Sequence, residues 1–290
     1  MKQLTLISGK GGTGKTTLVS AFAALAKEAI LVDADVDAPD LHLVMRPEFV
    51  GQEDVGGGEV ARIIEEKCTY CGQCETACVF RAVDEFWVSP LFCRGCAVCT
   101  LVCPSDAIEM LPKTLGQVLV GRTAYGPFVY PRMHIGESGT GRFITALRNK
   151  AREIGTRENK ALTIIDGSPG IGCSLIASIG GVDAVLAVTE PTLSGMHDLE
   201  RVLDVAAHFG ISAQVCVNKF DIHERNTDRI EAFCRDRGVE SVGRIPYDPE
   251  VSRSLAQGKH ILESNRTGVI EAIEKVWRNV SDGLCRNGSR

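Results

Sequence analysis

Short runs of apolar and β-branched residues recur along the chain, and most of them end in a loop rich in Gly, Asp or Pro. Such runs are typical of buried strands, whereas the apolar periodicity of the stretch that ends near Lys27 predicts a helix. The alternation of strands and helices predicts an α/β fold, with a doubly wound, mostly parallel sheet between two layers of helices. The strands are expected at residues 4–8, 29–32, 161–165, 184–188, 214–217 and 241–245.

The last apolar pattern predicts a helix that faces the core. Val269, Ile273 and Val276 recur at helical spacing, and the opposite face mixes acidic and basic side chains. An amphipathic helix that binds a membrane surface would carry an excess of cations. No apolar stretch approaches the roughly twenty residues that cross a bilayer, so we expect no stable membrane insertion.

Composition narrows the possible partners and the compartment. The 290 residues carry a net charge of −5 and no basic run, which argues against nucleic acid as a main partner. The length suggests about two domains. Because the start Met-Lys-Gln-Leu-Thr does not resemble an export signal, we expect the twelve cysteines to lie in a reducing cytoplasm.

A glycine-rich loop follows the first predicted strand and precedes a helix, which is the context of a P-loop. The glycines let backbone N–H groups surround the β-phosphate at a helix N-terminus. Lys15 would reach the β and γ oxygens, and the Thr16 hydroxyl is placed for Mg²⁺. The predicted ATP-binding residues of this loop are Gly9, Lys10, Gly11, Gly12, Thr13, Gly14, Lys15, Thr16 and Thr17.

Carboxylates follow two of the predicted strands. The strand at 29–32 ends in the acidic loop 33–37, and the strand at 161–165 ends in Asp166 and a Gly-Ser-Pro-Gly loop, which has the form of a Walker B motif. Sites in open parallel sheets lie at such carboxyl ends. Asp166 is therefore predicted to hold a magnesium-bound water.

Lys10 gives the loop a more specific signature. An extra lysine at the second position of the loop marks the deviant Walker A ATPases, and the stretch resembles the group that contains MinD, Mrp, ParA and the nitrogenase iron protein. The resemblance implies an ATP-dependent sandwich dimer in which Lys10 contacts the nucleotide of the opposite subunit, as an arginine finger does. The alternative is an ordinary solvated lysine.

The same resemblance implies roles for the acidic loop. In the Asp-x-Asp pattern of the group, Asp35 would position the attacking water and Asp33 would support the magnesium site, next to Thr16 and Asp166. Asp37 and Asp40 remain alternatives for the role of Asp35.

The base of the nucleotide is assigned to two later loops. By resemblance to the related ATPases, Asn218 would contact the adenine, and a buried structural asparagine is the alternative. The run 241–245 is followed by Pro246, which would close the base pocket.

Eight cysteines form two copies of one spacing, with intervals of two, two and three residues. In the two-cluster pattern of bacterial ferredoxins, the fourth cysteine of each run binds the other cluster. The predicted ligands are Cys68, Cys71, Cys74 and Cys103 for one [4Fe-4S] cluster, and Cys78, Cys93, Cys96 and Cys99 for the second.

Residues 60–111 resemble the bacterial two-[4Fe-4S] ferredoxin family, although Val79 stands where that family usually has a proline. Disulfides would need an oxidising compartment, and two zinc sites would leave the third and fourth thiols of each run unexplained. We expect a small α+β ferredoxin-like domain at 60–111, inserted between two parts of the ATPase domain at 1–59 and 112–290. It is too small to bury a large core, so its clusters should stabilise it.

The segment 113–155 is expected to form a strand and a linker, and the sheet to resume only at Ala161. Of the remaining cysteines, Cys173 stands seven residues beyond Asp166, as does a cluster ligand of the nitrogenase iron protein, but the second ligand has no counterpart. We therefore favour a packed or redox-sensitive thiol there. Cys216 and Cys234 should pack as small apolar residues, and Cys285 should lie in a polar tail.

Three functions are compatible with these patterns. The first is a nucleotide-switched dimer, homomeric or formed with a similar ATPase, that hydrolyses ATP with Mg²⁺ and passes electrons through its clusters to a partner protein. The second is an assembly factor or carrier for iron-sulfur or metal cofactors, as Mrp-type relatives are, although the C-terminal Cys-x-x-Cys of those carriers is missing. The third is a MinD-like positioning or cell-division ATPase with a redox-sensing insert.

Overall fold

The structure is a computed structural model that describes residues 1–137, 141–264 and 267–286. It divides into two compact units. The first comprises residues 1–52, 118–131 and 139–290, and the second comprises residues 53–117 and 132–138. Each unit is described by itself.

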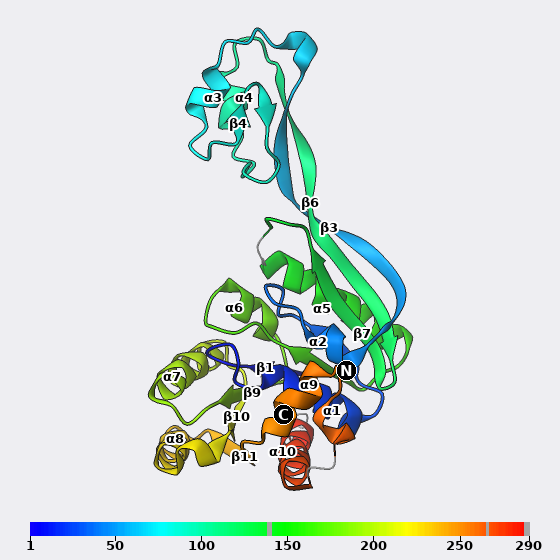
Figure 1. Ribbon diagram of the computed structural model, residues 1–290, viewed down its shortest axis with the longest axis vertical. Coiled ribbons are helices and arrows are strands. Elements are labelled where there is room, and N and C mark those ends of the chain that lie inside the picture. Colours follow the sequence, from blue (N-terminus) through cyan, green and yellow to red (C-terminus); the bar gives the residue numbers. More distant parts are fainter. Residues whose placement is uncertain (138–140, 265–266, 287–290) are drawn as a thin grey trace. The chain divides into compact units, whose positions relative to one another are not determined.

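A mostly parallel sheet organises the first unit, as the sequence predicts (Figure 1). The pairs β1–β8, β1–β9, β2–β8, β9–β10 and β10–β11 are all parallel. Within the described residues the strand order is β11-β10-β9-β1-β8-β2-β7-β6-β3. The strands are β1 (Lys2–Ile7), β2 (Ile30–Asp33), β7 (Gly126–Met133), β8 (Leu162–Asp166), β9 (Ala184–Thr189), β10 (Ala213–Asn218) and β11 (Glu240–Ile245).

Helices cover both faces of the sheet. Leu4 and Leu6 of β1 face α1, whereas Thr5 points the other way and donates its hydroxyl to the carbonyl of Ser178 in α6. The helices are α1 (Lys15–Ala26), α2 (Leu41–Met45), α5 (Gly141–Arg157), α6 (Cys173–Ile179), α7 (Leu193–His208), α8 (Glu224–Asp236), α9 (Pro249–Ala256) and α10 (Thr267–Arg286), with short 3-10 turns η2 (Phe220–Ile222) and η3 (Ile261–Glu263).

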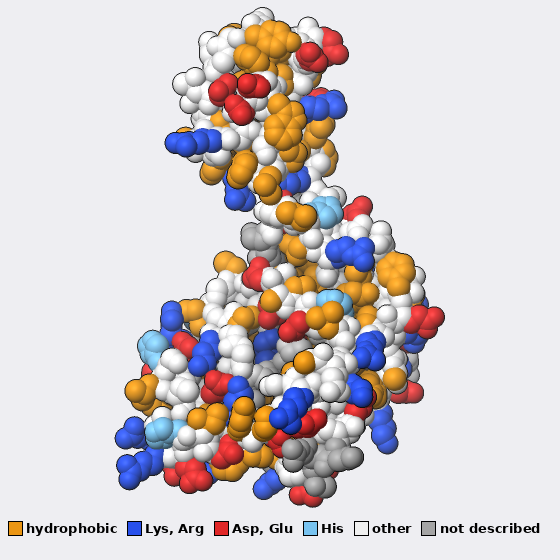
Figure 2. Space-filling model, in the orientation of Figure 1, with side chains coloured by type: hydrophobic (Ala, Val, Ile, Leu, Met, Phe, Trp, Pro, Cys, Tyr) orange, Lys and Arg blue, Asp and Glu red, His pale blue; other side chains and the backbone are white. Residues whose placement is uncertain are grey.

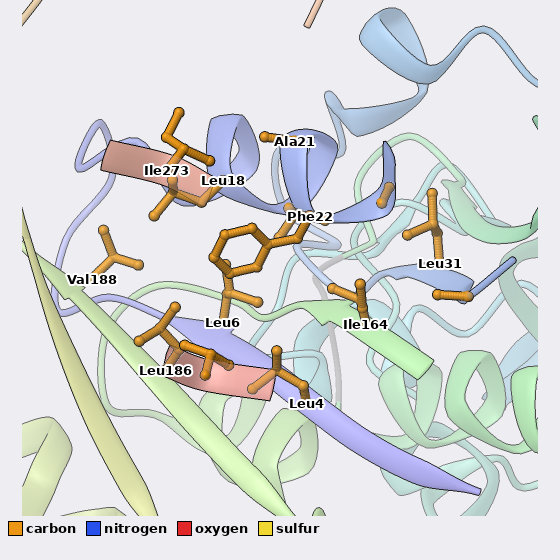
Figure 3. Packing of buried hydrophobic residues seen from close by; sticks show 14 of the residues in the cluster. Leu4, Leu6, Leu18, Ala21, Phe22, Leu31, Ile164, Leu186, Val188 and Ile273 are labelled. Atoms are coloured by element: carbon orange, nitrogen blue, oxygen red, sulfur yellow. The ribbon is translucent and has the colours of Figure 1, made fainter. Parts of the chain in front are cut away.

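The core lies between β1, α1 and α10 (Figure 3). Phe22 of α1 is fully buried above Leu6, and its ring centroid lies 5.0 Å from that of Trp277 in α10. Ile273 and Val276 are buried as well, so the prediction of a core-facing last helix is confirmed. No helix among the described residues is long and apolar enough to cross a membrane.

The expectation that the sheet resumes only at Ala161 is wrong. β7 pairs in parallel with β2, with Leu31 opposite Phe128 and Val32 opposite Val129. The pattern was obscured because glycine and proline flank the apolar run of β7. The segment expected to be a strand and a linker also contains the helix α5, which buries Leu147 and other apolar residues at helical spacing.

The second unit carries the eight repeated cysteines. Its small core consists of Ala61, Cys74, Val83, Val88 and Ile108. The elements are β3 (Glu48–Ile63), η1 (Glu65–Lys67), α3 (Gln73–Ala77), the antiparallel pair β4 (Val83–Asp84) and β5 (Trp87–Val88), α4 (Val98–Val102) and β6 (Ile108–Thr123). β3 and β6 are neighbours in the sheet, and both continue from one unit into the other.

Candidate functional site

The glycine-rich loop joins β1 to α1 and forms the wall of a large cavity. Gly14 precedes α1 with a φ of 91°, where a side chain would be strained, and an added Cβ would lie 2.3 Å from Nδ2 of Asn218. Only glycine fits there. The cavity has a volume of about 390 Å³ and is lined by Ser8, residues 11–17, Asp35, Asp37, Ala38, Asp40, Pro169, Asn218, Lys219, Val251, Ser252 and Leu255.

Lys15 lies beneath this cavity among carboxylates. Its Nζ contacts Oδ1 of Asp166 and lies 3.5 Å from Oδ2 of Asp35. Burial lowers the pKa of Lys15, but the negative charges of Asp166 and Asp35 more than offset this, and the pKa is raised. Lys15 therefore stays charged where phosphate oxygens would enter.

Asp33 and Asp35 occupy different positions in the acidic loop. Asp33 is fully buried, and its carboxylate accepts the N–H groups of Asp35 and Leu41 at 3.1 and 3.3 Å. Burial raises the pKa of Asp33 well above its ordinary value, and the charge of Asp166 adds to the shift. Burial also raises the pKa of Asp35, although Lys15 opposes it. Asp35, Asp37 and Asp40 line the cavity, whereas Asp33 lies behind it.

The carboxylates suit a hard divalent cation. Asp33 and Asp166 end neighbouring strands in register with one another, and Thr16 follows Lys15 on the cavity wall. Oδ2 of Asp166 is buried without a hydrogen-bond partner, so this oxygen is available to an ion or to its bound water. Of the residues assigned to magnesium from the sequence, Thr16 lines the cavity, whereas Asp33 and Asp166 are fully buried beside it.

Lys10 points away from the cavity within its own chain. Its Nζ lies 3.5 Å from a carboxylate oxygen of Glu190 and from the hydroxyls of Thr192 and Ser194. Gly9, beside it, packs closely against Asp198. Neither Gly9 nor Lys10 lines the cavity.

A smaller cavity continues the large one. It is lined by Asn218 and Pro246, so the two residues assigned to the base lie on the same cavity. The Asn218 side chain donates to the carbonyl of Thr13 at 2.7 Å and accepts the N–H of Lys219 at 3.0 Å. Asn218 thus fixes the glycine-rich loop, which is the structural alternative for it, and it also lines the smaller cavity.

Sequence reasoning missed several residues of these walls. Lys219 donates to the carbonyl of Gly12 at 3.1 Å and lies 2.5 Å from Glu190, and α9 contributes Val251, Ser252 and Leu255. The Asn-Lys pair after β10 was a usable signal. The α9 residues were not, because nothing in the sequence fixes where this helix folds back.

The eight repeated cysteines line two cavities. The first is bounded by Cys68, Cys71, Cys74 and Cys103, and the second by Cys78, Cys93, Cys96 and Cys99. The structure therefore groups the cysteines in the two sets that the sequence assigns, with one cysteine exchanged between the runs.

Backbone N–H groups point at equivalent sulfurs of the two runs. Ala82 donates to Sγ of Cys78 at 3.3 Å, and Ala107 donates to Sγ of Cys103 at 3.2 Å. The N–H of Ala107 lowers the pKa of Cys103, whereas burial raises the pKa of Cys74 and of Cys99. Such donors stabilise thiolates and cluster sulfurs.

Within the described part of the chain, no three His, Cys, Asp or Glu side chains converge closely enough to hold a single metal ion. The thiols of each set line one common cavity, and a multinuclear cluster would take its ligands from such a set, one at each corner.

The other cysteines behave differently. Cys216 and Cys234 are buried as expected, and burial raises their pKa values to about 12 and about 11. Cys173 is exposed at the start of α6. Cys285 is also exposed, but it lies in the last turn of α10 rather than in a polar tail.

Comparison with known proteins gives a consistent result for the fold. Residues 4–261 match the model of the CobQ/CobB/MinD/ParA nucleotide binding domain. The uncharacterized protein MJ0578 of Methanocaldococcus jannaschii is 30% identical over 283 residues, which cover 97% of this chain and 96% of that protein. The MinD structure from Pyrococcus horikoshii with Mg-ADP superimposes with a TM-score of 0.62 at 16% identity, covering 100% of this chain and 99% of that one.

Two shorter matches differ in kind. A stretch of 56 residues is 39% identical to the indolepyruvate oxidoreductase subunit IorA of Methanothermobacter marburgensis and covers 18% of this chain and 9% of that protein. A stretch of 141 residues is 23% identical to the cytosolic Fe-S cluster assembly factor NBP35 of Eremothecium gossypii and covers 41% of this chain and 42% of that protein.

Proposed function

The chain belongs to the CobQ/CobB/MinD/ParA nucleotide-binding family, and we propose that it is an ATP-hydrolysing dimer that couples its nucleotide state to electron transfer through two [4Fe-4S] clusters. The observation that carries this proposal is the grouping of eight cysteines around two cavities, in the exchanged pattern, within a chain that also has a P-loop site.

The nucleotide site supports ATP hydrolysis. Bound triphosphate would attract the Nζ of Lys15 away from Asp166 and Asp35, since all three compete for one cation. Magnesium, held by Thr16 and through Asp166, would supply charge to the phosphates. Asp35, on the cavity wall, is then placed to orient the attacking water, with Asp33 fixing the loop from behind.

Lys10 supports the dimer. Within one chain it contacts Glu190 rather than the nucleotide cavity, so its contact with a nucleotide would have to be made in a second subunit. The partner subunit is a second copy or a similar ATPase.

The cysteine sets support electron transfer rather than a structural metal. A [4Fe-4S] cluster in each cavity would accept and release single electrons. The N–H groups of Ala82 and Ala107 would tune the potentials through the sulfurs of Cys78 and Cys103. The match to an oxidoreductase subunit agrees with this use.

Coupling between the two sites has a covalent path through α2. The first residue of α2, Leu41, donates its N–H to the Asp33 carboxylate. Arg46, the residue after α2, donates its guanidinium to the carbonyl of Gln257 at 2.8 Å, and Gln257 is the residue after α9. Both contacted segments adjoin the nucleotide cavity, and β3 begins two residues after Arg46. A change in the acidic loop would therefore reach, through α2, the strand that leads into the cysteine-bearing unit.

The decisive experiment follows the clusters of anaerobically loaded protein by electron paramagnetic resonance while ATP is added. We expect both clusters to stay bound and to cycle by one electron, with electron release to a viologen or flavin acceptor faster in ATP than in ADP. Equal rates with ATP and ADP would contradict the coupling.

The match to an iron-sulfur assembly factor favours a second candidate, a cluster carrier. Intact transfer of iron and sulfide to an apo-ferredoxin during ATP turnover would establish the carrier and exclude the relay. Against it, the eight repeated cysteines already form two complete sets of four, as a resident pair of clusters requires.

A further inference from the structure

Apolar side chains are unusually exposed on the cysteine-bearing unit. Half of the large apolar side chains that are exposed in the described structure belong to it, although it is much the smaller unit. Figure 2 shows such side chains spread over this unit, in the upper part of the view. Exposed apolar surface of this density marks a contact surface.

Six of its residues form what we call the basic apolar face: Val79, Phe80, Arg81, Arg94, Val98 and Leu101. Phe80, Arg94 and Val98 line the cavity of Cys78, Cys93, Cys96 and Cys99, which places them together. Val79 and Arg81 flank Phe80 along the chain, and Leu101 lies three residues after Val98 in α4, on the same side of that helix. Val79 and Leu101 are 84% and 85% exposed.

The two arginines of this face have no ion-pair partner among the described residues. Elsewhere in the unit, Arg62 is paired with Glu109 and Lys113 with Glu137. Arg81 and Arg94 are both exposed, so their charges are available to carboxylates of another molecule.

The other cysteine cavity has more acidic surroundings, since Asp84 is the one acidic residue that adjoins the lining of the cavity at the basic apolar face outside the Arg62–Glu109 pair. Three acidic residues are next in the chain to residues that line this other cavity: Glu75, Glu85 and Asp106. Outside the Arg62–Glu109 ion pair, Lys67 is the one basic residue that adjoins its lining in the same way. An acidic protein would be repelled there and attracted to the basic apolar face. The two cavities therefore present different docking surfaces.

We propose that the basic apolar face is the docking site of an electron-transfer protein whose contact surface has an apolar centre and carboxylates at its rim. The inference rests on the proposed function. One electron passes between the cluster held by Cys78, Cys93, Cys96 and Cys99 and a one-electron centre of the partner, so that one is oxidised and the other reduced by a single electron. No proton or further reactant is required.

The first test uses an acidic flavodoxin as the probe and the fully iron-loaded chain, at low ionic strength and without oxygen. Calorimetric titration should show that Arg81→Glu/Arg94→Glu raises the Kd at least about tenfold, because rim charges steer and hold a complementary partner. The control is Lys67→Glu/Arg132→Glu, which changes the net charge equally and should leave the Kd within about twofold.

The second test addresses the apolar centre. Val79→Ser/Leu101→Ser should raise the Kd about tenfold, since buried apolar anchors dominate binding, and the change removes only exposed side chains. Ile135→Ser is the control, because Ile135 is 96% exposed in the same unit but outside the face, and it should have no effect. The rate of flavin reduction at low flavodoxin concentration should fall in proportion to affinity.

The iron content of the parent chain distinguishes a failure of the proposed function from a failure of the docking site alone. If the parent chain does not load two clusters, the proposed function fails and this inference fails with it. If two clusters load, the inference alone is overturned by any of three results: no binding of flavodoxin, an unchanged Kd in both face variants, or weaker binding in the Lys67→Glu/Arg132→Glu control. It is also overturned if sedimentation shows that Val79 and Leu101 join two copies of the chain.

Discussion

Lys10 has one contact in the isolated chain and, in the dimer that we propose, another with the nucleotide of the second subunit. Its Nζ lies 3.5 Å from Glu190, in a cluster where Glu190 also binds Lys219. The pair is only partly exposed, but its long Nζ–carboxylate distance makes its contribution to stability small, so leaving it costs little. A lysine of this position is free to move to a nucleotide in a second subunit.

We expect Lys10→Ala to abolish ATP-dependent dimerisation while nucleotide affinity in the monomer changes less than about threefold, because Lys10 lies outside the cavity. Sedimentation with a non-hydrolysable ATP analogue measures the first effect and fluorescent nucleotide binding the second. Lys275→Ala, on the exposed side of α10, is the matched control. A variant that still dimerises normally would remove Lys10 from this role.

Asp35 and Asp33 should respond differently to substitution. Asp35→Ala leaves the loop anchored, so we expect ATP hydrolysis to fall at least about a hundredfold with binding retained, as for loss of a group that orients the nucleophile. Asp33→Ala removes the acceptor of two buried N–H groups and should lower the free energy of unfolding by about 1–3 kcal/mol. Phosphate release and thermal unfolding distinguish them. Normal turnover in Asp35→Ala would transfer the role to Asp37 or Asp40.

At the scale of elements, the loop between β1 and α1 contains two glycines that should respond in opposite ways to substitution by alanine. Gly14→Ala combines a φ of 91° with a contact of 2.3 Å to Asn218, so it should weaken nucleotide binding at least about tenfold. Gly11→Ala meets nothing within 4 Å and should bind within about threefold of the parent. Equal affinities would show that the loop rearranges on binding.

Some elements were predictable and others were not, for physical reasons. The central strands are short apolar runs because both of their faces are buried, and this signal is local. β7 was missed as part of the sheet because its glycine and proline flanks resemble a linker, and only its pairing with β2 identifies it. α5 was missed although its buried residues, such as Phe143 and Leu147, follow helical spacing.

The same distinction holds for the sites. The glycine-rich loop and the cysteine sets are defined by spacing within short segments, so the sequence places them correctly relative to their own element. Other features of the sites bring together residues that are far apart in the chain. Examples are the contact of Lys10 with Glu190 and the cavity wall formed by α9. No spacing rule encodes such contacts.

At the scale of the whole molecule, iron content tests the exchanged cysteine sets. The parent chain should hold about eight iron atoms, and Cys74→Ser/Cys103→Ser should keep about four, because both residues serve the same cavity. If each run instead held its own cluster, this double variant would lose both. Cys216→Ser, in β10, is the control and should keep the parent iron content.

The adjacency of β3 and β6 has a consequence for how such chains arise. Because the two strands that lead into the cysteine-bearing unit are neighbours in one sheet, its ends are hydrogen-bonded to each other where they leave the ATPase. A segment with paired ends can be gained, lost or exchanged between genes by replacing one hairpin tip, without changing the order of any other strand. For the same reason, protein engineers can transfer the cysteine-bearing segment to another protein through two adjacent strands.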